Sequence, residues 1–279
     1  MDNAASIVQD HRLLLAILAP LIGAHPGEVV VHDTTTLNVY QLVHGAIGLN
    51  PGRTVIAISE HDFPTDRYVV DGIAEALGYT VRHGFDRLDD VAVVVRSVID
   101  YRTAELVDVK AETARAHAAG ALVVWDLSHA VGAIDIDLHD CGAQLAIGCS
   151  YKFLNGGPGA PAWTYVAKEL QASIRQPIWG WFATEDQFAM GPEFRPRADI
   201  ARMLLGTPTI MALAAAEVGI ALSAEAGMAA IHRKGGALTG FAIDLCDELG
   251  LATPTPRDPA RRGNHVAIEH PQAKAVVKD

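Results

Sequence analysis

The sequence predicts an α/β fold built on a mostly parallel sheet. Half of its 279 residues are hydrophobic and a fifth are charged, which is the balance of a protein with a large core. Over residues 1–170, strand-like and helix-like segments alternate, and the strand-like ones are continuous runs of Val, Ile, Leu and Ala. Such runs are typical of strands buried on both faces, and their alternation with helices is typical of parallel sheets.

The elements of this first part can be expected in order along the chain. Apolar residues at helical spacing predict a helix near residues 6–23. A β-branched run follows, and Asp33 and Thr34 are candidate N-caps for a helix through Gly45. The remaining expected elements are strands at 29–31, 54–59, 91–95, 121–125, 143–147 and 161–166, a helix over 65–77 closed by Gly78, and a helix within 105–119.

The character of the sequence changes after residue 170. Residues 176–196 are rich in Trp, Phe, Gly and Pro, which indicates a structured surface loop. Two helices are expected over 208–225 and 228–249, followed by a loop rich in Pro and Arg. The short apolar run at 265–270 reads as a strand, and the last nine residues begin a helical pattern.

Charge and cysteine content exclude several classes of protein. The formal net charge of -11 argues against sequence-independent nucleic-acid binding, which needs a basic face. Three cysteines imply no disulfide framework, and a reducing cytoplasm is the simplest setting. The apolar run near the N-terminus follows acidic and polar residues, is interrupted by Pro20, and is too short to cross a membrane.

The densest group of polar residues lies within 123–166. Asp126 ends one apolar strand, His129 comes three residues later, and Lys152 follows the next strand. In open α/β sheets, ligands bind at the carboxyl ends of the strands. We therefore expect Asp126 and Lys152 to face one site.

An acid and a lysine in this arrangement suit pyridoxal phosphate. Its aldehyde condenses with a lysine amine, and its ring nitrogen needs a carboxylate partner to stay protonated. Its phosphate needs hydroxyl and backbone N–H groups, and the residues from Asp33 to Thr36 lie between a strand and a helix. Phe63 could stack on the ring. Each feature alone is more often a cap, a turn or a solvated charge, so the combination carries the prediction.

The segments DLSHAVG (126–132), LHDCG (138–142) and SYKFLNGGPGAPA (150–162) resemble those of kynureninase. Kynureninase is a fold-type-I pyridoxal-phosphate enzyme of the class V aminotransferase superfamily. DTTTLNVYQLV, FPTDRY, WGWF, GTPTIMALAA and RRGNHVAIEHP follow the family's order. The resemblance implies a three-layer fold-type-I large domain over 1–205, with its N-terminal part incomplete. It also implies connecting helices and a truncated small α/β domain over 206–279.

The resemblance also implies roles for individual residues. Lys152 would bind the cofactor aldehyde, Asp126 the pyridine nitrogen, and Tyr151 would donate a proton during catalysis. No metal is implied. The implied cofactor-binding residues are Thr35, Thr36, Phe63, Asp66, Ser97, Asp126, His129, Tyr151, Lys152, Trp181 and Thr207. Trp181 and Thr207 would reach a neighbouring subunit's site, which implies a homodimer.

The implied reaction is hydrolysis of L-kynurenine, or its 3-hydroxy form, to anthranilate or 3-hydroxyanthranilate and L-alanine. This reaction belongs to tryptophan catabolism in the cytoplasm. The sequence differs from the family at two substrate-binding positions, so cofactor binding and full turnover are kept as two separate hypotheses. Thr184 stands where the family has a histidine that helps bind the aromatic substrate. The family's C-terminal arginine, which clamps the substrate carboxylate, has no counterpart here, and Arg261 and Arg262 are not its equivalents.

Three alternative hypotheses stay open from the sequence. The chain could bind the cofactor without turnover, or it could catalyse another class V reaction such as transamination or desulfuration. A desulfurase needs a cysteine on a mobile loop, whereas Cys141 and Cys149 are expected in or beside buried structure. A metal hydrolase would use Asp126 and His129 with His139 and Cys141, but their spacing matches no known ligand pattern.

Overall fold

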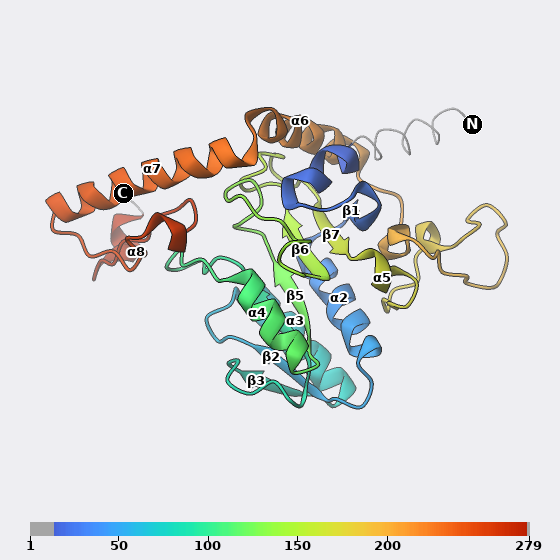
Figure 1. Ribbon diagram of the computed structural model, residues 1–279. Helices are drawn as coiled ribbons and strands as arrows, with labels where there is room; N and C mark the ends of the chain where they lie inside the picture. Colours follow the sequence, from blue (N-terminus) through green and yellow to red (C-terminus); the bar gives the residue numbers. More distant parts are fainter. Residues whose placement is uncertain (1–13, 278–279) are drawn as a thin grey trace.

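The computed structural model describes residues 14–277, so much of the helix expected near 6–23 lies outside the described residues. Within this part of the chain, seven strands form one sheet in the order β1-β7-β6-β5-β4-β2-β3 (Figure 1). The strands are β1 (Val29–Val31), β2 (Val55–Ile58), β3 (Thr80–His83), β4 (Val91–Ser97), β5 (Leu122–Asp126), β6 (Leu145–Cys149) and β7 (Ala162–Val166).

The sheet is mostly parallel, as the sequence predicts. Strands β3, β2, β4, β5 and β6 pair in parallel, and β7 pairs antiparallel with both β6 and β1. The six strands expected from apolar runs within residues 1–170 are all present. β3 was not expected, because its four residues are exposed or half-buried and include Arg82. An edge strand of this kind lacks the continuous apolar run of a central strand.

Helices cover both faces of the sheet, which gives three layers (Figure 1). Helices α2 (Thr35–Leu49) and α3 (Pro64–Leu77) pack on one face through residues such as Leu42 and Ile73. On the other face, α4 (Val109–Ala118) and α6 (Ile210–Ala226) pack in the core that contains Trp125 and Trp163. The fold expected for the class V superfamily is therefore the fold observed.

One expected strand differs from the structure. α4 lies within the expected range 105–119 and begins at Val109, because the Asp108 side chain accepts a hydrogen bond from the Ala111 N–H and caps the helix there. The expected strand at 265–270 is wrong. This segment makes only an isolated bridge between Ala252 and Glu269, because no neighbouring strand in the described residues pairs with it.

The C-terminal part of the chain is helical. α6 leads through Gly227 into α7 (Met228–Glu248), and α8 (Ala273–Val276) lies near the end of the described residues. α5 (Lys168–Gln171) and several short 3-10 helices complete the described elements. No single helix in residues 14–277 is long and apolar enough to cross a membrane. α6 and α7 meet that test only when taken together, and they are bent by 84° at their junction.

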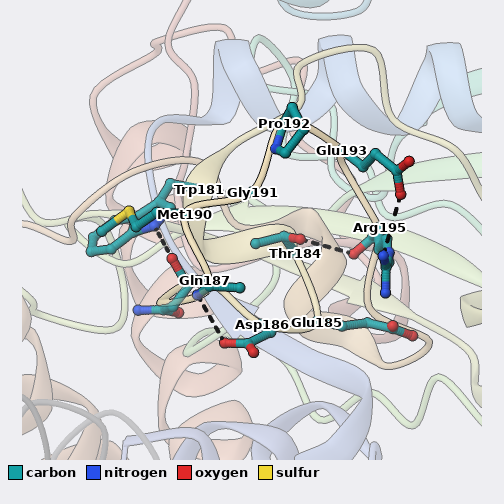
Figure 2. Close-up of a pocket in the computed structure, with 11 residues that line it drawn as sticks. Trp181, Thr184, Glu185, Asp186, Gln187, Met190, Gly191, Pro192, Glu193 and Arg195 are labelled. Carbon is teal, nitrogen blue, oxygen red and sulfur yellow. Dashed lines mark hydrogen bonds and ion pairs between the residues drawn. The ribbon is translucent and has the colours of Figure 1, made fainter.

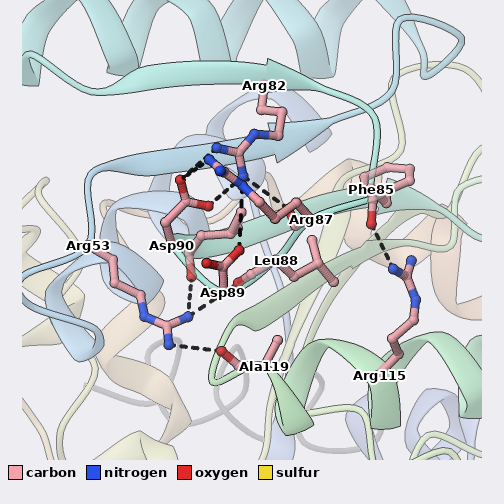
Figure 3. Close-up of polar contacts among 10 residues, drawn as sticks. Arg53, Arg82, Phe85, Arg87, Leu88, Asp89, Asp90, Arg115 and Ala119 are labelled. Atoms are coloured by element: carbon pink, nitrogen blue, oxygen red, sulfur yellow. Dashed lines mark hydrogen bonds and ion pairs between the residues drawn. The ribbon is translucent and has the colours of Figure 1, made fainter.

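A polar network fastens the amino-terminal edge of the sheet (Figure 3). Arg53 donates to the backbone oxygens of Val91 and Ala119, both at 2.8 Å. Arg82 on β3 forms a fork with the Asp90 carboxylate, with distances of 2.5 and 2.7 Å. These contacts join Arg53, just before β2, and β3 to the start of β4 and to the end of α4. The predicted site residues lie at the opposite edge of the sheet, where the parallel strands end.

Candidate cofactor site

The strand register brings the predicted site residues to one edge of the sheet. Ser97 at the end of β4 lies opposite Asp126 at the end of β5. The loop after β6 carries Lys152, and Cys149 at the end of β6 pairs with Ala162. The N–H of Ala162 donates to the Asp33 carbonyl at 2.9 Å, which fixes the start of α2 at the same edge.

Asp126 is a buried carboxylate with few partners. Asp126 is only 7% exposed, and its Oδ1 accepts a hydrogen bond from the Ser128 N–H at 2.7 Å. Burial raises the pKa of Asp126, while the hydrogen bonds from Ser128 and the positive charge of Lys152 act in the opposite direction. The site therefore holds an acid whose charge would be favoured by a nearby cation.

Lys152 faces this acid without neutralising it. Its Nζ lies 5.5 Å from the centre of the Phe63 ring and 5.9 Å from that of Tyr151. Burial raises the pKa values of both Asp66 and Asp126, and the positive charge of Lys152 opposes that rise at both carboxyl groups, which places the three side chains at one site. Within the described residues, Lys152 forms no ion pair with a carboxylate. The amine is thus close to the acids and free of a direct partner.

Two further carboxyl groups complete the cluster. Asp66, at the start of α3, was predicted from FPTD. Burial, followed by the charges of Asp126 and Asp62, raises its pKa well above the ordinary value. Asp62 was not predicted. Its Oδ2 accepts from the Ser59 N–H and its Oδ1 from the Ser97 N–H, both at 2.9 Å. Asp62 therefore ties the ends of β2 and β4 together, and burial raises its pKa.

The start of α2 offers backbone N–H groups at the edge of the site. Thr34 is the N-cap, and its side-chain oxygen accepts from the Leu37 N–H. Asp33 is not the cap: it has a positive φ of 45°, and its Oδ2 lies 3.0 Å from His32 Nδ1. The N–H groups of Thr35 and Thr36 belong to the first turn, where a helix has no internal partners for them. With no acidic residue in that turn, it suits an anion.

Aromatic side chains border the open side of the cluster. Phe63 is 38% exposed and Tyr151 is 47% exposed, so both rings offer faces to a planar ligand. Burial raises the pKa of Tyr151 to about 12, so its phenol keeps its proton at neutral pH. Burial, together with the positive charge of Lys152, lowers the pKa of His129 to about 4, so its imidazole is neutral.

Trp181 and Thr207 lie outside this cluster of contacts. Trp181 begins a short 3-10 helix, its ring packs against Phe182 and Phe188, and its Nε1 donates to the Gln187 carbonyl at 2.6 Å. With Thr184 it lines a cavity of about 420 Å³ within its own loop (Figure 2). Thr207 is exposed just before α6.

The residues of the metal hypothesis are not brought together. His139 Nε2 lies 2.7 Å from Glu28 Oε2, at a separate place in the fold. Across residues 14–277, no group of three or more His, Cys, Asp or Glu side chains is arranged to hold a metal ion. Cys149 is buried at the end of β6 and Cys141 is half-buried, as expected.

Comparison with known proteins identifies the family. The family described as aminotransferase class-V matches residues 4–276. Curated relatives named kynureninase are 43% identical in Pseudomonas fluorescens and 40% identical in Deinococcus radiodurans, each over 94% of this chain. The chain belongs to the kynureninase family. It spans 67% and 66% of the length of these two relatives, about two thirds in each case.

Solved structures support the fold of this kynureninase-family chain. Apo cysteine desulfurase from Thermococcus onnurineus NA1 superposes with a TM-score of 0.86 at 18% identity, covering 99% of this chain and 72% of that one. A lysine-to-alanine mutant of C-DES, with glycine covalently linked to its PLP cofactor, gives 0.84 at 16% identity, covering 100% and 77%. At these identities the likeness concerns the fold alone.

The family implies pyridoxal phosphate as cofactor, and the residues present fit it. Asp66 Oδ2 is buried and meets no donor in the described residues, so the acid cluster has unused hydrogen-bonding capacity. A buried carboxylate, an amine without an ion-pair partner, and a helix N-terminus without acidic residues match the ring nitrogen, the aldehyde and the phosphate. This match concerns the chemistry of the groups and their common edge.

Proposed function

We propose that this chain catalyses the pyridoxal-phosphate-dependent hydrolysis of L-kynurenine or 3-hydroxy-L-kynurenine. The products are anthranilate or 3-hydroxyanthranilate and L-alanine. The single observation that carries the proposal is the placement of Asp126 at the end of β5 and of Lys152 in the loop after the neighbouring parallel strand β6, in a chain of the kynureninase family. This placement joins the acid and the amine that the cofactor requires.

Each residue of the cluster has a role in this proposal. When bound, pyridoxal phosphate supplies an aldehyde that condenses with amines and a protonated ring that accepts electrons from the bond being broken. Asp126 would hold the proton on the ring nitrogen. Lys152 would hold the cofactor through its aldehyde, and its amine would take up a proton from the substrate α-carbon. Tyr151 keeps its phenolic proton at neutral pH and could donate it to a substrate carbon.

Other predicted residues bind and orient the cofactor. Thr35 and Thr36 bind the phosphate through the first turn of α2, Phe63 stacks on the ring, and Ser97, Asp66 and His129 complete the surroundings. We further propose a homodimer in which Trp181 and Thr207 reach the neighbouring subunit's site. The exposure of Thr207 and of the Trp181 loop supports this assignment. The cysteine content supports a cytoplasmic location.

Titration with pyridoxal phosphate tests the proposal. We expect a visible absorbance band on binding that is absent in Lys152→Ala and retained in Lys110→Ala, a control lysine paired with Asp140. Kynurenine is then added and anthranilate is followed by its fluorescence. A band without anthranilate would show a cofactor-binding chain that does not turn over. Release of sulfide from cysteine, with no product from kynurenine, would replace the proposed reaction with desulfuration.

A further inference from the structure

We propose that His265 is a positioning residue that holds the His129 ring at the cofactor site. This inference rests on the proposed function, because it concerns the same site. Its starting point is a contact between two distant parts of the chain: the ring centres of His129 and His265 lie 5.7 Å apart with a tilt of 46°. His129 follows β5, whereas His265 lies beyond α7.

His129 depends on packing for its orientation. Its ring has aromatic neighbours on two sides: Phe153, with ring centres 6.5 Å apart, and His265. Phe153 is the residue next to Lys152, and the charge of Lys152 acts on both histidines. Burial lowers the pKa values of both imidazoles, so they pack as neutral rings. Removing His265 would leave the His129 ring supported on one side.

Hydrogen bonds to two other parts of the chain hold the segment just before His265 in place. The Gly263 N–H donates to the Ala104 carbonyl at 2.8 Å, and the Asn264 amide donates to the Ala133 carbonyl at 2.9 Å. Ala104 is buried and has a positive φ of 64°, a strained conformation for a residue with a side chain. These contacts tie the segment before His265 to the loop after β4 and to the turn after β5.

Arg262 anchors the other side of this segment. Its buried guanidinium donates to Thr239 Oγ1 and to the Gly236 carbonyl, both on α7, at 2.9 Å each. The Leu106 N–H donates to the Arg261 carbonyl at 2.9 Å. In Figure 1 the segment beyond α7 accordingly turns back toward the sheet. His265 is therefore fixed by backbone and buried polar contacts, as a positioning role requires.

The role assigned to His265 requires an aromatic ring and does not require its nitrogens. Both ring nitrogens are buried and have no hydrogen-bond partner within residues 14–277, so no contact of the described residues depends on them. The contact that remains is the one between the two rings, and the role of His265 therefore acts through His129 alone.

A double-mutant cycle on cofactor affinity tests this assignment. An aromatic pair contributes about 0.5–1.5 kcal/mol beyond its buried area, which corresponds to roughly a two- to twelve-fold change in a dissociation constant. We expect His265→Ala to weaken pyridoxal-phosphate binding by about five-fold in the wild-type background. In the His129→Ala background it should change binding by less than about two-fold. Equal losses in both backgrounds would overturn the proposal.

Two further variants separate positioning from folding. His265→Phe keeps the ring and removes the unpaired nitrogens, so it should restore cofactor affinity to within about two-fold and unfold no earlier than wild type. Loss of affinity in this variant would contradict the assignment. His117→Ala is the control, because His117 also has a buried, unpartnered Nε2 but lies on α4. Since affinity is measured without kynurenine, absence of hydrolysis would not affect the outcome.

Discussion

The buried carboxyl groups of Asp66 and Asp126 belong to one cluster, and each shifts the pKa of the other. Burial and the charge of Asp126 raise the pKa of Asp66 well above its usual range. Burial also raises the pKa of Asp126, but the hydrogen bonds from Ser128, the charge of Lys152 and a hydrogen bond from Asp66 oppose that rise. Asp66 is thus the member of the pair that binds a proton more readily. The lack of any donor to Asp66 Oδ2 in the described residues agrees with this, because an ionised carboxylate requires donors.

Asp66→Asn should stabilise the cofactor-free chain at neutral pH. A carboxyl whose pKa is raised on folding binds protons more tightly in the folded state. The free energy of unfolding therefore falls as pH rises from the ordinary value of 3.8 toward the raised value. An asparagine amide can donate to Asp126 without this cost. Each unit by which folding raises the pKa corresponds to about 1.4 kcal/mol of unfolding free energy. A difference of this size between wild type and Asp66→Asn can be measured by urea unfolding at several pH values.

The matched control has the opposite sign. Arg197 donates to both oxygens of Asp199, at 2.8 and 2.6 Å, and this hydrogen bonding lowers the pKa of Asp199. Asp199→Asn should reduce stability at neutral pH, and the difference from wild type should shrink as pH falls through the acid range. If Asp66→Asn left the pH dependence of wild type unchanged, the assignment of the proton to Asp66 would be wrong.

Asp126→Asn should separate cofactor binding from turnover. The amide has the shape of the carboxylate but cannot keep the cofactor ring nitrogen protonated, so the ring becomes a poor electron acceptor. We expect kynurenine hydrolysis at saturating cofactor to fall at least about 100-fold, while the visible band persists. Asp71→Asn, the same change at an exposed position on α3, is the control. A variant at position 126 with more than a tenth of wild-type turnover would contradict the role of Asp126.

The sequence predicts the centre of this site because its two main residues come directly after strands that can be recognised from their apolar runs. Asp126 and Lys152 each follow an apolar run, and parallel strands end at the same edge, so their proximity follows from local patterns and one topological rule. β3 was missed because its residues face solvent and lack that pattern.

The residues that the sequence did not reveal act through hydrogen bonds to the backbone or through contacts between segments far apart in the sequence. Asp62 accepts the N–H groups of Ser59 and Ser97, which join β2 and β4 only after the sheet forms. The signal that could have revealed Asp62 is its place in the sequence: it is a second acidic residue, close to Asp66, in the same strand-to-helix turn. His265 meets His129 across more than a hundred residues, and its apolar surroundings in sequence indicated a strand instead.

Gly132→Ala tests how closely the turn after β5 supports the lysine loop. Gly132 has a positive φ of 78°, and a Cβ there would lie 2.5 Å from the Phe153 carbonyl oxygen, next to Lys152. The substitution combines backbone strain with a clash against main chain, so we expect about 2–4 kcal/mol of destabilisation and weaker cofactor binding. Gly78→Ala is the matched control, with a φ of 71° and no atom within 4 Å of the added Cβ. It carries strain alone and should cost about 1 kcal/mol with unchanged cofactor affinity. Equal effects of the two substitutions on affinity would show that the turn does not support Lys152.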